Sequence, residues 1–574
     1  MAVPFFFDPS TPPSRPQKAN LMTGNTTTIE QIRDFKGKYP KQLWYLFGTE
    51  MWERFCFYGM RGMLTVFMVS NLGLDDKAAN LQYGAIQAFV YAFTFIGGVF
   101  ADKILGFQKS LFWGALLMIA GGFIIAFSPT DLFYIGISFS IIGTGFFKPN
   151  ISTMVGQLYH DGDHRRDAGF GLFYAGINLG ALLGGVLMVW VGKAYSWRLA
   201  FALVGIVMII SLVNFAFRRA SFGPIGLSPL HPDMPKSRKR LYEIATYVGS
   251  LIAIPLILIM VTKTQYTDLF MYVVGPVALA YLLFEMSMFS DPDGATGARP
   301  ALLVLAGLVL LNGGLLVLKS FGYAFGDLVD YVVIGATLLC FILAMVKGNV
   351  LQRRLHAALI FILFSILFWA FFEQSGGSLS LFALNNLKAD LFGLAIDPNV
   401  VNNSANSLFV IIFSAPLGLL WVWLSARKME PNSVVKFGLG FLLLALAFFA
   451  FYASIFFADA DGITSLELFT LAYFIITFGE LCLSPIGLSL MTKLSPVRIQ
   501  GLMMGMWFLA SAYGQYVAGL LGAGMSSADP EATPLMKLHA YTDGYSQLAI
   551  YALVSGGVLI AISPLVRKLM RGVH

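Results

Sequence analysis

The sequence is short of charged residues, cysteine and histidine, and each shortage excludes a class of protein. Only 12% of its 574 residues are charged and 57% are hydrophobic, a balance that is too apolar for a water-soluble fold. The three cysteines (Cys56, Cys340 and Cys482) all fall in apolar segments, so they indicate neither a disulfide framework nor a metal site. All six histidines fall in loops or near the ends of apolar segments. The remaining composition, with 58 glycines and 15% aromatic residues, is typical of a helical membrane protein that crosses the bilayer many times.

Apolar runs of about 18–25 residues, each long enough to span a bilayer, occur in groups of six, four and six. The first six lie near residues 43–70, 80–101, 109–128, 131–155, 168–191 and 198–217. The middle four lie near 241–262, 267–289, 300–320 and 328–346, and the last six near 356–387, 402–425, 434–457, 467–492, 500–523 and 546–568. The second pair of the middle group is less clear, because NGG at 312–314 interrupts it. The total is therefore 14 or 16 spans, and hydropathy favours 16.

This grouping predicts an all-α polytopic membrane protein with five parts. We expect a cytoplasmic N-terminal tail (1–42), a six-helix bundle (43–217), a linker with two to four extra transmembrane helices (218–355), a second six-helix bundle (356–568) and a cytoplasmic C-terminal tail (569–574). No cleavable signal peptide is expected in the first 40 residues, where a short FFF patch precedes a polar stretch. Two six-helix halves around an insertion indicate the major facilitator fold, with a substrate cavity between the halves.

The positive charges predict the orientation. Cytoplasmic loops of membrane proteins are rich in Lys and Arg. Basic residues follow the sixth span, precede the last six and recur in alternate loops: Arg218, Arg219, Lys236, Arg238, Lys239, Arg240, Lys347, Arg353, Arg354, Arg427, Lys428, Lys493, Arg498, Arg567, Lys568 and Arg571. The opposite loops are acidic: Asp75, Asp76, Asp390, Asp397, Asp459, Asp461 and Glu467. An even number of spans with both termini inside satisfies all of these loops. The net charge of +7 therefore reports orientation and does not indicate a nucleic-acid partner.

The loop between the second and third spans carries a further signal. Its sequence GGVFADKILGFQKS (97–110) resembles the major facilitator pattern G-x-x-x-D-x-x-G-x-(R/K). Gly98, Asp102 and Gly106 would permit a tight turn there. We expect this loop to act in gating and not in substrate contact.

The first span contains four ionisable side chains in the stretch GTEMWERFCFYGMRGML (48–64). On a helix, Glu50, Glu53, Arg54 and Arg61 share one face. A lone charge at the bilayer centre costs about 2.5–3.5 kcal/mol, so these groups need partners or a water-filled cavity. Two interpretations follow: a functional site, which intramembrane charges usually mark, or a buried salt bridge that only holds helices together.

Three further charges lie well inside spans: Lys148, Glu373 and Glu480. With the first span they make four carboxylates against three cations, an excess of one negative charge. A buried, unpaired carboxylate favours proton uptake, so we expect the set to hold one exchangeable proton. The alternative is a glutamate that stays protonated or faces water. Cations of the first half would pair with carboxylates of the second across the cavity, presenting one positive and one negative wall suited to a zwitterion.

Several motifs match one transporter family in order and spacing. Glu50 together with WERFCFYGMRGML resembles the signature E-x-x-E-R-F-x-Y-Y of the proton-dependent oligopeptide transporters (POT/PTR) of the major facilitator superfamily. FFKPN, FYAGINLGAL, GELCLSPIGLSL and GMWFLASAYG resemble that family's motifs in spans 4, 5, 10 and 11. Two departures stand out, because Phe57 replaces the first tyrosine of the signature and Ser407 stands where a proline is usual after Asn406. The lost phenol bears on substrate range, not on class.

The resemblance implies a role for each candidate residue. Glu50, Glu53 and Arg54 would couple the proton. The substrate site would be formed by Arg61 and Lys148 (peptide carboxylate), by Glu480, Asn178 and Asn406 (peptide amino group), and by Tyr58, Tyr91, Trp507 and Ser511 (pocket lining). The pairs Arg61–Glu373 and Lys148–Glu480 would link the two bundles.

The function implied is a bacterial peptide transporter of the inner (plasma) membrane. It would import di- and tripeptides together with H⁺ by alternating access, with no enzymatic reaction, no metal and no cofactor beyond the proton gradient. One alternative keeps the fold but changes the substrate to nitrate or an amino-acid-like metabolite. Another is a transporter-derived membrane sensor, which would usually carry a soluble signalling domain, and the sequence shows none.

Overall fold

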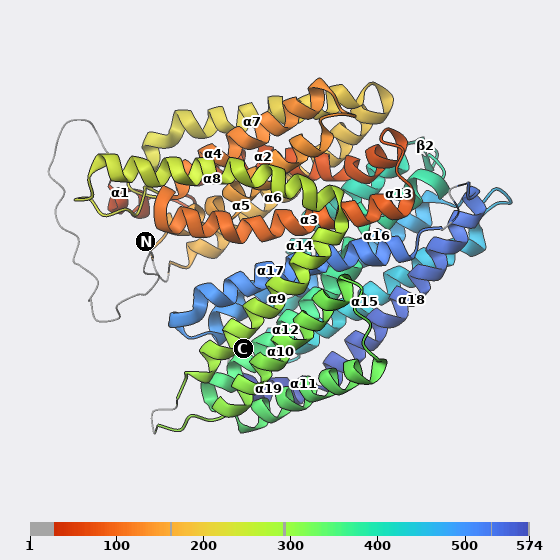
Figure 1. Ribbon diagram of the computed structural model, residues 1–574. Coiled ribbons are helices and arrows are strands. Elements are labelled where there is room, and N and C mark those ends of the chain that lie inside the picture. Colours follow the sequence, from red (N-terminus) through yellow and green to blue (C-terminus); the bar gives the residue numbers. More distant parts are fainter. Residues whose placement is uncertain (1–27, 161–162, 291–293, 528, 530, 572–574) are drawn as a thin grey trace.

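The computed structural model describes residues 28–160, 163–290, 294–527, 529 and 531–571. The predicted tails therefore lie partly outside the described residues, at 1–27 and 572–574. Figure 1 shows two helical bundles side by side, the first in red to yellow and the second in cyan to blue. The predicted all-α fold is confirmed.

The first bundle follows a short helix, α1 (Ile29–Arg33). Its elements are α2 (Lys41–Ser70), α3 (Asp76–Phe100), the π-helix η1 (Ala101–Leu105), α4 (Phe107–Phe127), α5 (Phe133–Gln157), α6 (Arg165–Ala194), α7 (Trp197–Arg218) and the 3₁₀ turn η2 (Arg219–Phe222). The central helices are α8 (Lys236–Thr262), α9 (Thr264–Ser287), α10 (Arg299–Ser320) and α11 (Asp327–Lys347).

The second bundle begins with α12 (Val350–Phe372), which is followed by the 3₁₀ turn η3 (Glu373–Gly376) and α13 (Ser378–Asn386). A two-stranded antiparallel hairpin, β1 (Asp390–Leu391) and β2 (Leu394–Ala395), leads into α14 (Pro398–Ala426). The remaining elements are α15 (Ser433–Ala453), η4 (Ser454–Phe457), α16 (Leu466–Leu494), η5 (Val497–Ile499), α17 (Gln500–Gly524), α18 (Pro534–Ala561) and α19 (Ser563–Met570).

The number of long helices agrees with the higher predicted total. Among the described residues, 13 helices are long and apolar enough to cross a membrane. Three more, α2, α5 and α17, have 30, 25 and 25 residues, and α2 is less apolar because of its buried charges. Together they place one helix in each of the sixteen predicted segments. The chain is a multi-pass membrane protein.

Three details differ from the sequence-based expectations. The predicted single span 356–387 breaks at Glu373, where the turn η3 begins; η3 ends at Gly376 and is followed by Gly377, and glycine readily leaves the helical conformation. The last long helix begins at Pro534, twelve residues before the predicted start, because Thr533 caps it through a side-chain bond to Met536 N. His539, expected in a loop, consequently lies in its second turn. In the loop motif only Gly106 is a true turn residue (φ 74°), since Gly98 lies in α3 and Asp102 in η1.

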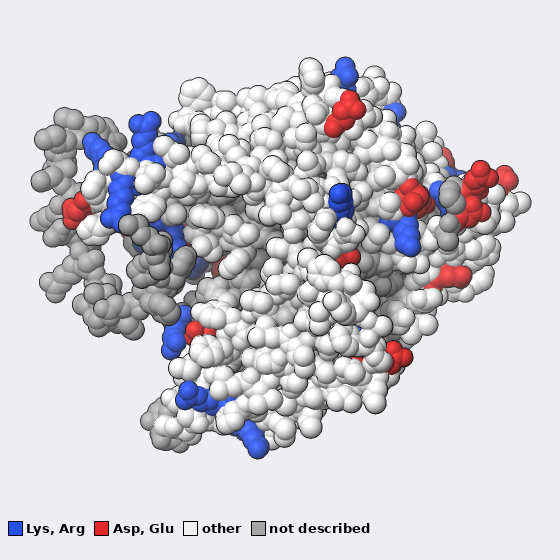
Figure 2. All heavy atoms as spheres, in the orientation of Figure 1, with Lys and Arg blue, Asp and Glu red and all other residues white. Residues whose placement is uncertain are grey.

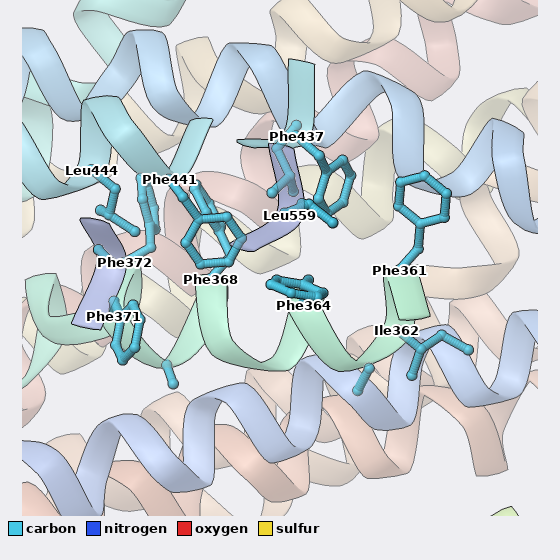
Figure 3. Packing of buried hydrophobic residues seen from close by; sticks show 14 of the residues in the cluster. Phe361, Ile362, Phe364, Phe368, Phe371, Phe372, Phe437, Phe441, Leu444 and Leu559 are labelled. Atoms are coloured by element: carbon cyan, nitrogen blue, oxygen red, sulfur yellow. The ribbon is translucent and has the colours of Figure 1, made fainter. Parts of the chain in front are cut away.

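Each bundle has its own hydrophobic core. Figure 3 shows part of the second, where aromatic rings of α12 meet those of α15. The ring centroids of Phe361 and Phe437 are 5.2 Å apart and those of Phe368 and Phe441 5.5 Å apart, both edge-to-face, the geometry that the ring quadrupoles favour. Between the bundles, Gly84 of α3 lies against Gly519 of α17, which lets these two helices approach closely.

Charge is separated between the two ends of the molecule. In Figure 2, Lys and Arg side chains gather at the end where α1 lies, and Asp and Glu side chains at the opposite end, beside the β1–β2 hairpin. A broad uncharged band lies between them. We call these the basic end and the acidic end. The pattern is the one expected of a protein that obeys the positive-inside rule.

Candidate proton and substrate sites

The three charged residues of α2 form one buried cluster. Glu50, Glu53 and Arg54 are 3%, 0% and 1% exposed. Arg54 Nε lies 3.0 Å from Glu50 Oε1 and 2.5 Å from Glu53 Oε2, while the N–H directions do not complete hydrogen bonds to these oxygens. One guanidinium thus serves two carboxylates, which leaves the cluster one positive charge short.

α6 closes this cluster from one side. A Cβ atom on Gly180 would lie 3.0 Å from Arg54 Cβ, so only glycine lets the two helices approach this closely. Gly180 therefore forms a point of close packing between α2 and α6. Water is excluded from the carboxylates on that side, which strengthens their interaction with Arg54.

Arg61 forms the predicted ion pair with Glu373, which joins the two bundles. The Arg61 guanidinium also donates to Tyr83 Oη (2.8 Å) and Ser375 Oγ (2.9 Å). The break between α12 and η3 brings Glu373 and Ser375 to this position. Tyr83 and Ser375 were missed by sequence reasoning, because an uncharged residue in a span gives no signal of its own.

The predicted pair Lys148–Glu480 is not formed in this conformation. Lys148 Nζ lies 4.1 Å from the ring centroid of Tyr91 and 5.5 Å from that of Phe57, and the ion pairs of the described residues do not include it. The aromatic rings of α2 and α3 hold the ammonium on the first bundle, so it does not reach across. This corrects the pairing that the family resemblance implied.

Glu480 instead accepts a hydrogen bond within its own bundle. Asn406 Nδ2 lies 3.0 Å from Glu480 Oε2 and 3.2 Å from Thr477 Oγ1. The predicted proximity of Asn406 and Glu480 is therefore present. Asn178, the other amide expected here, donates to Tyr174 O of its own helix (3.0 Å), so no bond brings it to Glu480.

The remaining candidates lie along the same helices. The Arg61 guanidinium carbon is 5.8 Å from the ring centroid of Tyr58. Trp507 is buried in α17 and contacts Gly487 of α16, and Ser511 Oγ donates to Trp507 O at 3.4 Å. These contacts place Trp507 and Ser511 in the second bundle but assign them no ligand. Among the described residues, no group of three or more His, Cys, Asp or Glu could hold a metal ion.

Polar contacts that sequence reasoning missed join the bundles at the acidic end. Lys193 of α6 pairs with Asp397 at the start of α14 (2.6 Å). Asp76 of α3 pairs with Lys537 of α18 (3.3 Å) and accepts a hydrogen bond from Tyr541 (2.8 Å). The sequence placed Asp76 and Asp397 at span ends, where charges report orientation and name no partner. These contacts hold the two bundles together at that end.

Helical bundles paired across a polar midplane, with charges buried at the interface, define a membrane transporter of the major facilitator type. Residues 108–230 and 327–536 match the sequence model of the POT family. The chain belongs to the POT family.

Relatives are similar over nearly the full length. The peptide transporter YePEPT of Yersinia enterocolitica subsp. palearctica is 30% identical over 558 residues, 94% of this chain and 96% of the relative. Dipeptide and tripeptide permease A of Escherichia coli K12 is 26% identical over 556 residues, 96% of this chain and 97% of the permease. The crystal structure of a peptide transporter POT in complex with sulfate is 29% identical with a TM-score of 0.73, covering 95% of this chain and all of that one (100%).

Proposed function

We propose that this protein is a proton-coupled symporter that imports di- and tripeptides by alternating access. It would reside in the bacterial inner membrane with both termini in the cytoplasm. Peptide and H⁺ are its ligands, the proton gradient supplies the energy, and the assignment includes no catalysed reaction and no cofactor. The two bundles, 43–217 and 356–568, would rock around the site, with 218–355 between them.

One observation carries the substrate assignment: a cation and a carboxylate lie unpaired on opposite bundles. Among the residues that the structure describes, the side-chain contacts of Lys148 on α5 are with aromatic rings, and Glu480 on α16 accepts a hydrogen bond from the Asn406 amide. A peptide carries a carboxylate at one end and an ammonium at the other, so it supplies the missing partner to each. Nitrate would satisfy Lys148 and leave Glu480 without a cation.

The α2 cluster supports the coupling assignment. Two buried carboxylates share one guanidinium, and one proton would neutralise the remaining negative charge. A proton moving down the gradient releases about 2.3 kcal/mol per 100 mV. The cluster lies on the same helix as Arg61, whose pair with Glu373 joins the bundles, so protonation can bias the same interface that the peptide uses.

Uptake by the purified protein in liposomes tests both assignments together. A labelled dipeptide should accumulate above its external concentration when an inward acid gradient is imposed, and should only equilibrate without one. Liposomes without protein provide the control. Equal accumulation with and without the acid gradient would contradict proton coupling. Uptake of an amino-acid-like metabolite without uptake of the peptide would favour the other substrate class.

A further inference from the structure

The residue that departs from the family signature, Phe57, lies between the proton cluster and the isolated cation. The Arg54 guanidinium carbon is 5.0 Å from the Phe57 ring centroid, and Lys148 Nζ is 5.5 Å from it. Phe57 is buried, and Tyr58 meets its ring edge-on at 5.2 Å. Two cations from different helices therefore lie over one fixed aromatic ring.

The electrostatic requirement differs between the two cations. Arg54 Nε forms ion pairs with Glu50 and Glu53, whereas among the described residues the side-chain contacts of the Lys148 ammonium are with two ring faces, Phe57 and Tyr91. A ring face attracts a cation without accepting a hydrogen bond from it, and the attraction is largest where water is excluded. The ring faces thus attract the ammonium without using its N–H donors, which leaves those donors available to an incoming anion.

We propose that Phe57 and Tyr91 form an aromatic clamp that positions Lys148 for the substrate carboxylate, with Phe57 as a specificity-determining residue. This proposal rests on the proposed function and deepens it. A tyrosine at position 57 would add an oxygen able to accept an N–H from either cation. Phenylalanine lacks that acceptor, so the preference for a peptide with an anionic terminus depends more strongly on Lys148.

The experiment compares inhibition of uptake by a dipeptide and by its C-terminal amide in liposomes containing the full chain. In Phe57→Leu, the preference for the free acid should fall by roughly 2- to 30-fold, the range of one cation–π contact, with affinity for the amide unchanged. Phe57→Trp, which restores a ring face, should regain the wild-type preference. Phe55→Leu is the matched control, because Phe55 is equally buried on the same helix (3% exposed, as is Phe57) and its ring lies edge-on to that of Trp52.

The outcomes separate the two levels of inference. If the wild type itself does not prefer the free acid, the proposed function fails. If the wild type prefers it and Phe57→Leu keeps the same preference, the clamp alone is overturned. Should Phe57→Leu fail to fold, Tyr91→Leu removes the other ring face and must show the same selective loss of preference.

A second, independent observation concerns the four central helices, which divide between the bundles. α8 belongs to the first: Lys109 of α4 pairs with Glu243 (2.5 Å), Trp113 Nε1 donates to Ser250 Oγ (3.0 Å), and buried residues of α8 join the first core. In Figure 1, α8 runs along the first bundle while α9, α10 and α11 lie against the second.

Helices α9 to α11 are fastened to the second bundle. Tyr516 of α17 donates to Asp268 of α9 (2.6 Å). The fully buried Gln352 of α12 accepts from Ala298 N (3.0 Å) and donates to Met286 O (3.1 Å) and Thr296 O (3.2 Å). Buried residues of α9, α10 and α11 also join the second core.

We infer that Lys263, the single residue between α8 and α9, is the hinge of the central segment. If the bundles rock against each other, α8 moves with the first and α9 to α11 with the second. The segment 218–355 then consists of two parts, and each part moves with a different bundle. The contact that must slide is α3 against α9, where the rings of Phe89 and Phe270 lie 5.2 Å apart.

Reversible cross-linking tests this division in a variant without the native cysteines. Cysteines at 89 and 270, bridged by a short membrane-permeant bifunctional thiol reagent, should lower uptake at least tenfold, and cleaving the bridge should restore it. Cysteines at 113 and 247 are the control, because those rings are 4.7 Å apart within one moving body. Full uptake with the 89–270 bridge closed, or loss of uptake with the 113–247 bridge, would overturn the hinge.

Discussion

Lys193 and Asp397 form an ion pair of 2.6 Å that joins α6 to α14 at the acidic end. The same ammonium donates to Asn399 Oδ1 (3.0 Å). Both side chains are about one-quarter exposed (24% and 28%), and ion pairs near the surface contribute at most about 1 kcal/mol. A contact of this strength can hold one end of the molecule closed and still break during a transport cycle.

Removing that charge pair should open the acidic end. Asp397→Asn keeps an acceptor for the Asn399 N–H that caps α14 (2.8 Å) and removes only the charge. We expect the population open at this end to rise up to about fivefold, the equivalent of about 1 kcal/mol. Distances between spin labels at Tyr195 and Phe392, both well exposed, measure the change.

Asp459→Asn provides the control for this opening. Asp459 lies in the loop between η4 and α16 and accepts from backbone N–H groups of that loop, so the label distances should stay as in the wild type. An unchanged distance distribution in Asp397→Asn would mean that the Lys193–Asp397 pair does not contribute to closure.

The α2 cluster predicts a separation of coupling from binding. Glu53→Gln keeps the shape of the side chain but removes the site where a proton would neutralise the cluster. Concentrative uptake driven by an acid gradient should be lost, while exchange of labelled for unlabelled peptide across the membrane continues at least in part. Gradient-driven uptake at the wild-type rate would remove Glu53 from the coupling mechanism.

The sequence predicted what depends on spacing along one helix and missed what depends on contacts between helices. Offsets of three and four residues suffice to bring Glu50, Glu53 and Arg54 together, and the structure confirms it. Charge counting predicted that cations of the first half face carboxylates of the second, and the family resemblance implied the pairs Arg61–Glu373, which is present, and Lys148–Glu480, which is not formed in this conformation. A count of charges does not compare the attraction of Lys148 to the rings of Phe57 and Tyr91 with its attraction to a distant carboxylate.

The ends of the spans were the other region that could not be predicted well from the sequence. Asp397 was interpreted from the sequence as a loop charge and Lys193 was not singled out, because hydropathy gives no partner for a residue outside the apolar run. The break after α12 at Glu373 was hidden for the opposite reason, because the apolar run continues through α13, although Gly376 and Gly377 separate the two helices.

Recognition of the peptide carboxylate predicts a simple selectivity in the wild type. A charge-assisted hydrogen bond contributes about 1.5–3 kcal/mol, and amidation of the C-terminus removes the charge. A dipeptide amide should therefore compete with a labelled dipeptide at least tenfold more weakly than the free acid. Equal competition by the two compounds would contradict a cationic site for the carboxylate.

The last prediction concerns whether Lys148 and Glu480, which form no ion pair in this conformation, interact at all. If the two charges do not interact, Lys148→Ala and Glu480→Ala should change thermal stability additively, within about 0.3–0.5 kcal/mol. A coupling energy well above that would show that the pair forms in another state of the cycle. Each single variant should nearly abolish peptide uptake, because each removes the ligand for one peptide terminus.

The double exchange Lys148→Glu with Glu480→Lys retains the net charge but reverses the polarity of the site, so uptake should stay absent. Full uptake by the exchanged variant would show that the peptide termini bind elsewhere.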